Sequence, residues 1–390
     1  MKSFTYHQST EIVFGSGRLA EAGEIVLKYG KRCLMVTTSD DALQALYERV
    51  KNILAEAGVE VAHFDGVIPN PTTETSSSGA AMAVEHKADV ILGLGGGSSM
   101  DAAKAIAVEA THSGSAWDYL FFKSPPPDPE KVLPVVAIGT TSGTGSQVTQ
   151  VSVVTKTAKR DKSALYNSVI FPKVAIVDPE LMLTMPKMVT AHTGFDAFCH
   201  AFESINNPNT GAYVDLLARE AIHLVVKNLP LVLKDGADLK AREKMAWADT
   251  LAGLSIASAG VTLPHGMGMA VGGMYPHVAH GEALAILYPA CTRFTAESAV
   301  KQYAFMAREL NPFLEKVSDA EAALESFDAI VTFLKSAGLY KSLKDVNMPE
   351  SEIEALARQS MVLPDYQGNP RVATFEEMVE LVKEAYYQKD

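Results

Sequence analysis

An acid and a histidine stand four positions apart in the segment HTGFDAFCHAFES, residues 192–204. The segment otherwise has the residue pattern of a helix, so Asp196 and His200 are expected on one helix face. Such a pair is commonly a hydrogen-bonded couple. It can also be half of a metal site, because carboxylate oxygens and imidazole nitrogens both bind divalent transition metals.

A second segment, LPHGMGMAVGGMYPHVAHGEALAILYP, adds His265, His277 and His280 to the candidates. Its only charged residue is Glu282, and a buried unpaired imidazole is unfavourable. Three imidazoles and one carboxylate form a reasonable ligand set for iron(II) or zinc. With one open position, such an ion could hold a substrate oxygen.

A glycine loop, GLGGGSSMDAAKA at 93–105, follows a predicted strand and begins a helix. Its glycines let the backbone turn tightly and approach a ligand. Ser98 or Ser99 could cap the helix, whose free N–H groups and dipole favour an anion such as a pyrophosphate. The same residues could also form a tight turn without a ligand, because glycine clusters recur by chance.

A polar loop, IGTTSGTGSQVTQ at 138–150, follows another predicted strand. Alone it could be a flexible linker. Two loops of this kind at strand ends of one sheet favour a nucleotide site. The small hydroxyl residues concerned are Thr140, Thr141, Thr144 and Ser146.

The elements around these loops alternate in the first half of the chain. This alternation predicts a parallel sheet with helices on both faces and ligands at the carboxyl ends of its strands. The predicted strands are 32–38, 59–66, 88–97 and 131–139, and the predicted helices are 40–58, 76–87 and 99–110.

From about residue 186 the apolar residues follow helical spacing only. Capping-box pairs predict two helix starts, Ser318 with Glu321 and Thr374 with Glu377. We therefore expect an α/β dinucleotide-binding domain over residues 1–185 and an all-helical metal-binding domain over residues 186–390.

Bulk composition excludes several classes of protein. The formal net charge of −12 argues against a nucleic-acid partner. The sequence has no run of eighteen apolar residues that would predict a membrane span, and its start lacks the apolar core of a signal peptide. Cys33, Cys199 and Cys291 are far apart, which fits a reducing compartment. A soluble cytoplasmic protein is expected.

Four motifs together resemble the iron-dependent, group III alcohol dehydrogenases. They are GGGSSMDAAKAIA, TTSGTGSQVT, TGFDAFCHAFES and LPHGMG…AHGEALAILYP. IVFGSG at 12–17, NPT at 70–72 and GNPR at 368–371 fit the same pattern, so the resemblance runs from about residue 10 to about residue 385. It implies a Rossmann-like domain followed by a helical domain, as in the dehydroquinate synthase-like fold.

The resemblance also implies a role for particular residues. The implied metal ligands are Asp196, His200, His265 and His280. The residues implied to take the cofactor's pyrophosphate are Gly96, Gly97, Ser98 and Asp101, and those implied to line the cofactor are Asn70, Thr140, Thr141, Thr149 and Lys162.

Three departures from the family pattern affect these expectations. Met269 stands where many members have a histidine suspected of passing protons, and the gap between the last two ligands is one residue longer. His277 lies in that altered segment; we expect it to act as the catalytic proton carrier, with ordered water or a simple surface histidine as alternatives. Thr38 replaces an acid common in NAD-preferring members, although Asp40 or Asp41 could bind the ribose, so NAD and NADP both stay open.

The expected function is a metal-dependent NAD(P) alcohol dehydrogenase that also works as an aldehyde reductase. Iron(II) is implied, zinc is possible, and a homodimer or larger homo-oligomer is expected. Small apolar segments at 248–260 and 268–276 favour a short primary alcohol or aldehyde, or a small polar one. The alternatives are a glycerol dehydrogenase-like or other polyol or short anionic aldehyde reductase, a synthase of the same fold, and a non-catalytic nucleotide-binding module.

Overall fold

The computed structural model describes residues 2–123 and 125–389, which form two compact units. One unit contains residues 6–185, and the other contains residues 2–5 together with residues 186–389. In the second unit, Lys2 Nζ donates to the Pro208 carbonyl at 3.1 Å and Phe4 stacks on Tyr213. The first residues therefore pack with the helical unit.

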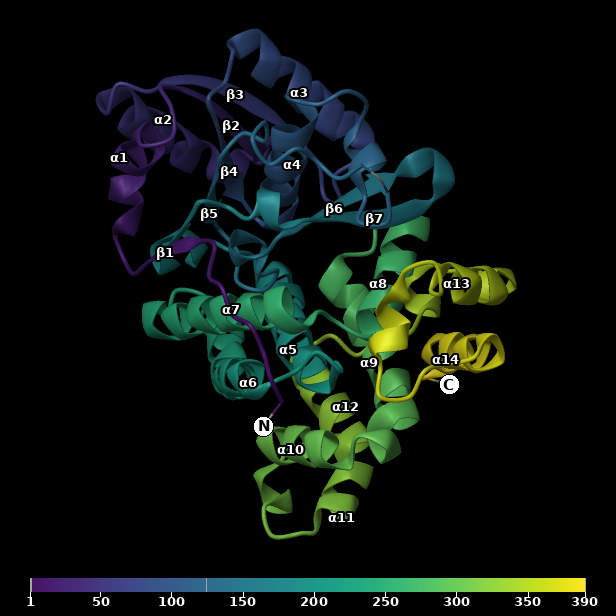
Figure 1. The fold of residues 1–390 in the computed structure, drawn as a ribbon. Helices are drawn as coiled ribbons and strands as arrows, with labels where there is room; N and C mark the ends of the chain where they lie inside the picture. The colour runs from purple at the N-terminus through teal and green to yellow at the C-terminus, as the bar shows by residue number, and fades with distance from the viewer. Residues whose placement is uncertain (1, 124, 390) are drawn as a thin grey trace. The chain divides into compact units, whose positions relative to one another are not determined.

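The first unit is built on a six-stranded sheet of order β1-β8-β5-β4-β2-β3 (Figure 1). Each neighbouring pair is parallel, as the alternation of strands and helices predicts. The strands are β1 Glu11–Phe14, β2 Arg32–Thr38, β3 Glu60–Val67, β4 Val90–Gly95, β5 Val135–Gly139 and β8 Val174–Val177.

Helices cover both faces of this sheet, and strand β2 shows why. Cys33 and Met35 pack in a core with α1 (Ala22–Leu27) and α2 (Gln44–Glu56). Leu34 and Val36 pack in a second core with helices α3 and α4. Because successive side chains of a strand point to opposite faces, a continuous apolar run fits a strand buried on both sides. The second pair of helices is α3 Thr73–His86 and α4 Gly97–Glu109.

The register of β4 and β5 places two loops next to each other. Gly95, the last residue of β4, pairs with Gly139, the last residue of β5. The glycine loop after β4 and the polar loop after β5 therefore leave the sheet at the same edge, where parallel sheets bind their ligands.

A separate antiparallel hairpin follows the polar loop and was not predicted from the sequence. It consists of β6 (Val151–Lys156) and β7 (Asp161–Tyr166), with Arg160 in a left-handed conformation at the turn. Val154 and Leu165 bury one face of the hairpin in a small cluster with residues of α4. The strands are short and rich in polar residues, so their alternation was too weak to read.

The second unit contains only helices and turns among its described residues, as expected. The helix α5 (Lys187–Asn206) runs through its larger core, where Phe195, Phe198 and Phe202 form a continuous aromatic stack. The other helices are α6 Ala212–Lys234, α7 Leu239–Ala259, α8 Leu263–Met274, α9 His280–Thr295, α10 Val300–Leu310, α11 Asp319–Leu324, α12 Ser326–Ser336, α13 Ile353–Gln359 and α14 Phe375–Tyr387.

Both capping boxes lie where the sequence places them. Ser318 and Glu321 begin α11, and Thr374 and Glu377 begin α14, each pair with reciprocal side-chain and backbone bonds.

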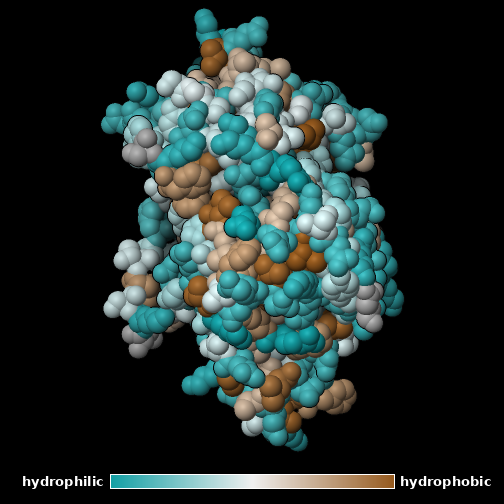
Figure 2. All heavy atoms as spheres, turned by 90° about the vertical axis from the view of Figure 1, so that its right-hand side faces the viewer, coloured by the Kyte–Doolittle hydropathy of each residue, from teal (hydrophilic) through white to brown (hydrophobic). Residues whose placement is uncertain are grey.

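The visible face of the molecule is mixed in hydropathy (Figure 2). On the face drawn in Figure 2, hydrophobic residues form small patches among hydrophilic ones. Within the described residues, no helix combines the length and the apolar character that crossing a bilayer requires.

A single glycine allows α9 to pack against α5. A Cβ on Gly281 would lie 2.1 Å from the backbone oxygen of His192, which cannot move without shifting α5. We expect Gly281→Ala to lower the free energy of unfolding by about 1–3 kcal/mol, as overpacking does, measured by urea denaturation of the full chain. Gly211→Ala is the comparison, because its Cβ would make only ordinary contacts with Phe4. Gly211 is the N-cap of α6, so we expect a loss of less than about 1 kcal/mol there; equal losses in both variants would contradict this account.

Candidate functional site

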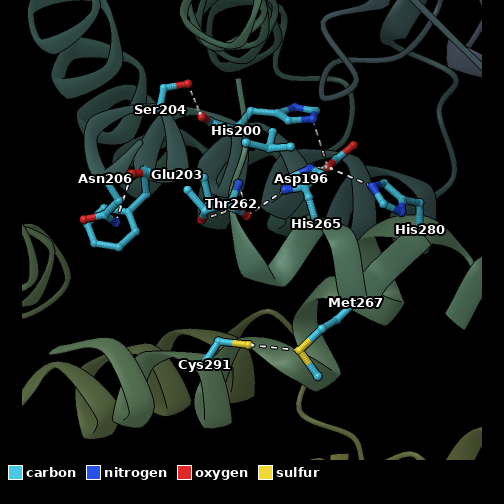
Figure 3. Close-up of polar contacts among 12 residues, drawn as sticks. Asp196, His200, Glu203, Ser204, Asn206, Thr262, His265, Met267, His280 and Cys291 are labelled. Atoms are coloured by element: carbon cyan, nitrogen blue, oxygen red, sulfur yellow. Dashed lines mark hydrogen bonds and ion pairs between the residues drawn. The ribbon is translucent and has the colours of Figure 1, made fainter. Parts of the chain in front are cut away.

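Three helices of the second unit bring four polar side chains to one point (Figure 3). Asp196 and His200 lie one turn apart on α5, on the side of the helix away from its aromatic stack. His265 lies in the first turn of α8, directly after Pro264, and proline is a common residue at the start of a helix. His280 is the first residue of α9.

The atoms that could bind an ion surround Oδ1 of Asp196. The Nε2 atoms of His265, His200 and His280 lie 3.4, 3.6 and 3.9 Å from that oxygen. The rings of His200 and His265 stack with their centroids 4.6 Å apart. Asp196, His200 and His265 are buried, whereas the His280 side chain keeps 24% of its surface exposed.

Two of these atoms are polar and buried but have no hydrogen-bond partner, namely Asp196 Oδ1 and His265 Nε2. Ligands bound at about 2.1 Å around a tetrahedral ion lie roughly 3.4 Å from each other. The observed separations match that value, and candidate ligand atoms of Asp196, His265 and His280 lie within 4.8 Å of one another. The donor set therefore fits a divalent transition metal.

The charges of the site are complementary. Burial alone would raise the pKa of Asp196, but His200 and the other imidazoles outweigh it and lower that pKa to about 2. Burial would lower the pKa of His265, but Glu203 and Asp196 raise it to about 10. The pocket thus favours positive charge beside Asp196, which is what a bound cation supplies.

Glu203 is a functional residue that our sequence reasoning missed. Its side chain is buried, and Oε1 lies 2.6 Å from Nδ1 of His265. Oε2 accepts hydrogen bonds from the backbone N–H of Thr262 at 2.8 Å and from its hydroxyl at 3.2 Å. Glu203 thereby holds the His265 ring with Nε2 toward Asp196, as carboxylates behind metal-bound histidines do. The available signal was the spacing of Asp196, His200 and Glu203 along one helix face.

The glycine loop in the first unit begins α4 without a side-chain cap. Gly96 is the N-cap residue and the helix starts at Gly97. The expectation that Ser98 or Ser99 caps the helix is therefore wrong, because both serines already lie in its first turn. The N-cap residue Gly96 has no side chain that could accept from the first N–H groups of the helix, so these groups can bind an anion.

The polar loop packs directly on the glycine loop. A Cβ on Gly96 would lie 3.2 Å from the Thr141 methyl group, and one on Gly97 would lie 2.8 Å from that of Thr144. Thr140 N–H donates to the Gly95 carbonyl at 2.9 Å. The hydroxyl of Thr141 is buried and has no hydrogen-bond partner.

The remaining predicted cofactor residues lie in three places. Lys162 Nζ donates to Asn70 Oδ1 at 2.7 Å, and Asn70 has a left-handed backbone with φ of 56°. Thr38 ends β2 with its hydroxyl 3.0 Å from Tyr47 OH. Asp40, two residues further along the chain, accepts from the Ala42 N–H at 2.9 Å.

Asp101 and Thr149 lie behind the two loops. Asp101 accepts hydrogen bonds at both carboxylate oxygens, from the Ser146 hydroxyl and the Val153 N–H. Thr149 is buried, with its hydroxyl 3.5 Å from Lys104 Nζ.

The structure does not bring His277 to the four clustered side chains. Its side chain is exposed, and Nε2 lies 3.0 Å from the Val346 carbonyl oxygen. Met269, at the position where a histidine was expected, is buried. This placement favours the alternative of an ordinary surface histidine.

Two family models together match most of the chain. The one described as iron-containing alcohol dehydrogenase matches residues 9–179, and the one described as the C-terminal part of that family matches residues 190–386. The NAD-dependent methanol dehydrogenase of Bacillus methanolicus is 34% identical over 96% of this chain and 97% of its own.

Solved structures agree with these matches. An alcohol dehydrogenase from a halo-thermophilic archaeon of a Red Sea brine pool has a TM-score of 0.93 and 35% identity, covering 99% of this chain and 100% of the other. The sulfoacetaldehyde reductase of Bifidobacterium kashiwanohense, solved with NAD+, has a TM-score of 0.85 and 29% identity, covering both chains fully.

The role of Glu203 can be tested by a substitution that keeps its shape. We expect Glu203→Gln to weaken metal affinity by about 10–100-fold, the usual effect of removing the partner behind a metal-bound histidine. Competition with a chromophoric chelator measures this affinity. Glu220→Gln, on an exposed part of α6, is the matched control; unchanged affinity in Glu203→Gln would show that the carboxylate does not support the metal.

Proposed function

The chain belongs to the iron-containing alcohol dehydrogenase family, and from this membership we propose that it transfers a hydride between a nicotinamide dinucleotide and a small primary alcohol or aldehyde. The observation that carries the proposal is the convergence of Asp196, His200, His265 and His280 on one point. Loss of any of these side chains would have favoured a non-catalytic nucleotide-binding module. The mainly apolar surroundings of the four side chains also disfavour a synthase, which needs several basic groups.

We propose iron(II) as the metal, with zinc as the alternative, because a nitrogen-rich set of four donors accepts either. When bound, such an ion supplies Lewis acidity that favours alkoxide character on the substrate oxygen. The chain supplies the rest of the site. Asp196 provides the negative charge, and Glu203 fixes the ring of His265.

The cofactor is proposed to bind at the glycine and polar loops of the first unit. The first N–H groups of α4 and the Thr141 hydroxyl would take the pyrophosphate, and Asn70 and Lys162 would line the remainder. Similarity to an NAD-dependent methanol dehydrogenase supports NAD. Thr38 carries no charge that would repel a 2′-phosphate, so NADP is the second candidate.

Three further expectations are carried forward as proposals. A cytoplasmic location is supported by three buried cysteines that form no disulfide. A homodimer or larger homo-oligomer follows from the family resemblance alone. The proton-carrying role of His277 stays a prediction, and its exposed position lends it little support.

A carboxyl group beside the cluster bears on the substrate class. Asp365 packs against Gly266, the neighbour of His265. A Cβ added to Gly266 would lie 3.7 Å from Oδ2 of Asp365. Burial raises the pKa of Asp365 to about 6, although His265 opposes the shift. An ionised carboxylate next to the cluster would disfavour an anionic substrate, which supports a neutral alcohol or aldehyde.

The proposed reaction is tested with metal-reconstituted protein. We expect NADH- or NADPH-dependent reduction of short aldehydes that is lost on exhaustive chelation and restored by iron(II). His265→Ala should lower kcat/KM more than about a hundredfold, because losing a side chain that binds the metal directly costs more than losing the carboxylate that orients it. His223→Ala, a half-exposed histidine on α6, should retain activity. Full turnover after chelation would contradict the proposal.

The effect of Asp365 is tested with paired substrates. Asp365→Asn should raise kcat/KM for an anionic short aldehyde, relative to propanal, by about fivefold, since removing a nearby like charge relieves about 1 kcal/mol of repulsion. Asp319→Asn, on a distant part of the surface, is the control. An unchanged ratio would show that Asp365 does not face the substrate.

A further inference from the structure

One ammonium group lies wholly inside the first unit. Lys104, in the middle of α4, has no exposed surface. Its Nζ lies 2.7 Å from the Ser146 carbonyl, 2.7 Å from the Val151 carbonyl and 2.9 Å from the Ser146 hydroxyl. An ammonium has three N–H donors, so these three acceptors use all of them.

Asp101, one helical turn earlier, completes this network. Its Oδ1 accepts the Ser146 hydroxyl proton at 2.6 Å and its Oδ2 accepts the Val153 N–H at 3.1 Å. The Ser152 hydroxyl donates to the Asp101 backbone carbonyl at 2.7 Å. Because a hydroxyl has one proton, Ser146 accepts from Lys104 and donates to Asp101. The bonds thus run in one direction, from a charged lysine to an ionised aspartate.

Both charged groups are bonded within the protein. All three protons of Lys104 are used, and both carboxylate oxygens of Asp101 accept bonds inside the protein. A buried ion pair of this kind is a weak source of stability, because desolvation offsets most of its attraction. The main effect of this network is on geometry, because the network joins α4 to Ser146 and to the start of β6.

The residues that it joins determine how the two loops meet. Ser146 directly follows Gly145, whose φ of 62° turns the chain. Just before this turn, the Thr141 side chain packs against Gly96, and the Thr144 side chain packs against Gly97. Fixing the Ser146 carbonyl and hydroxyl to α4 therefore fixes the polar loop against the glycine loop.

We propose that Lys104, acting with Asp101, is a positioning residue for the nicotinamide cofactor. It holds the polar loop over residues 139–146 at the separation from the glycine loop that a bound pyrophosphate requires. The inference rests on the proposed function for the identity of the ligand. It assigns Asp101 to this positioning network in place of the direct cofactor contact that the family resemblance implied. Preorganised loops bind more tightly because binding does not have to order them.

The test uses Lys104→Met, which keeps a long side chain and removes all three donors. We expect the Kd for NADH, or for NADPH if that is the cofactor, to rise about 10–100-fold, since charged hydrogen bonds are lost and two buried carbonyls lose their donor. Fluorescence titration of the full-length, metal-loaded protein measures this Kd. The values of kcat at saturating cofactor and KM for the alcohol should stay within about threefold of wild type, because the metal site lies in the other unit.

Lys131→Met is the matched control, since Lys131 is largely exposed and its Nζ lies 3.3 Å from the Asp128 carboxylate. It should bind the cofactor like the wild type. If Lys104 had a purely structural role, Lys104→Met would lower the melting temperature but would not raise the cofactor Kd while leaving the alcohol KM unchanged.

A second variant keeps the proposal testable if Lys104→Met does not fold. Ser146→Ala removes only the hydroxyl that links Lys104 to Asp101, and it should raise the cofactor Kd about threefold to tenfold, as loss of a hydrogen bond does. A folded Lys104→Met, or in its absence Ser146→Ala, with wild-type cofactor affinity would overturn the inference. A wild-type protein that binds neither dinucleotide would instead refute the proposed function.

Discussion

The helical unit depends on the burial of one carboxylate among three imidazoles. Asp196 lies inside the protein with a buried oxygen that no N–H or O–H satisfies, and each imidazole presents a nitrogen toward it. A buried anion without compensation is strongly unfavourable. The arrangement is reasonable only if positive charge resides there, first from a protonated histidine and then from a metal ion.

The packing of the unit follows from this requirement. The helix α5 buries aromatic rings on one side and presents Asp196, His200 and Glu203 on another, so one element serves both the core and the site. The start of α9 can approach α5 only because residue 281 is glycine, and this approach delivers His280. The same logic holds in the first unit, where two glycines let the polar loop lie against the start of α4.

The sequence was most informative where chemistry and spacing coincide. The parallel sheet, the helical second half, both capping boxes and the family were predictable, because apolar periodicity and ordered motifs encode them. The candidate metal ligands stood out because their residue types are costly in an apolar environment, and the family resemblance then implied which four of them bind the ion. The predicted helix cap was wrong because it depended on the local backbone conformation. Ser98 and Ser99 were good caps by type, but Gly96 takes that place because the backbone is already extended there.

Other features were outside the reach of sequence reasoning. Glu203 was one acid among many until its distance to His265 was known. Lys104 read as an ordinary helical lysine, and only the fold reveals that it is buried and bonded to two carbonyls. His277 was attractive because of its neighbours in the sequence, but the turn before α9 directs it to the surface.

The most direct measurement is X-ray absorption at the metal edge, made on protein reconstituted with one equivalent of iron(II) or zinc, for the wild type and for Asp196→Asn. We expect one ion per chain, surrounded by three imidazole nitrogens and a carboxylate oxygen at about 2.0–2.2 Å, and a loss of that ordered environment in the variant. An ion coordinated mainly by other side chains, or an unchanged spectrum in Asp196→Asn, would contradict the account.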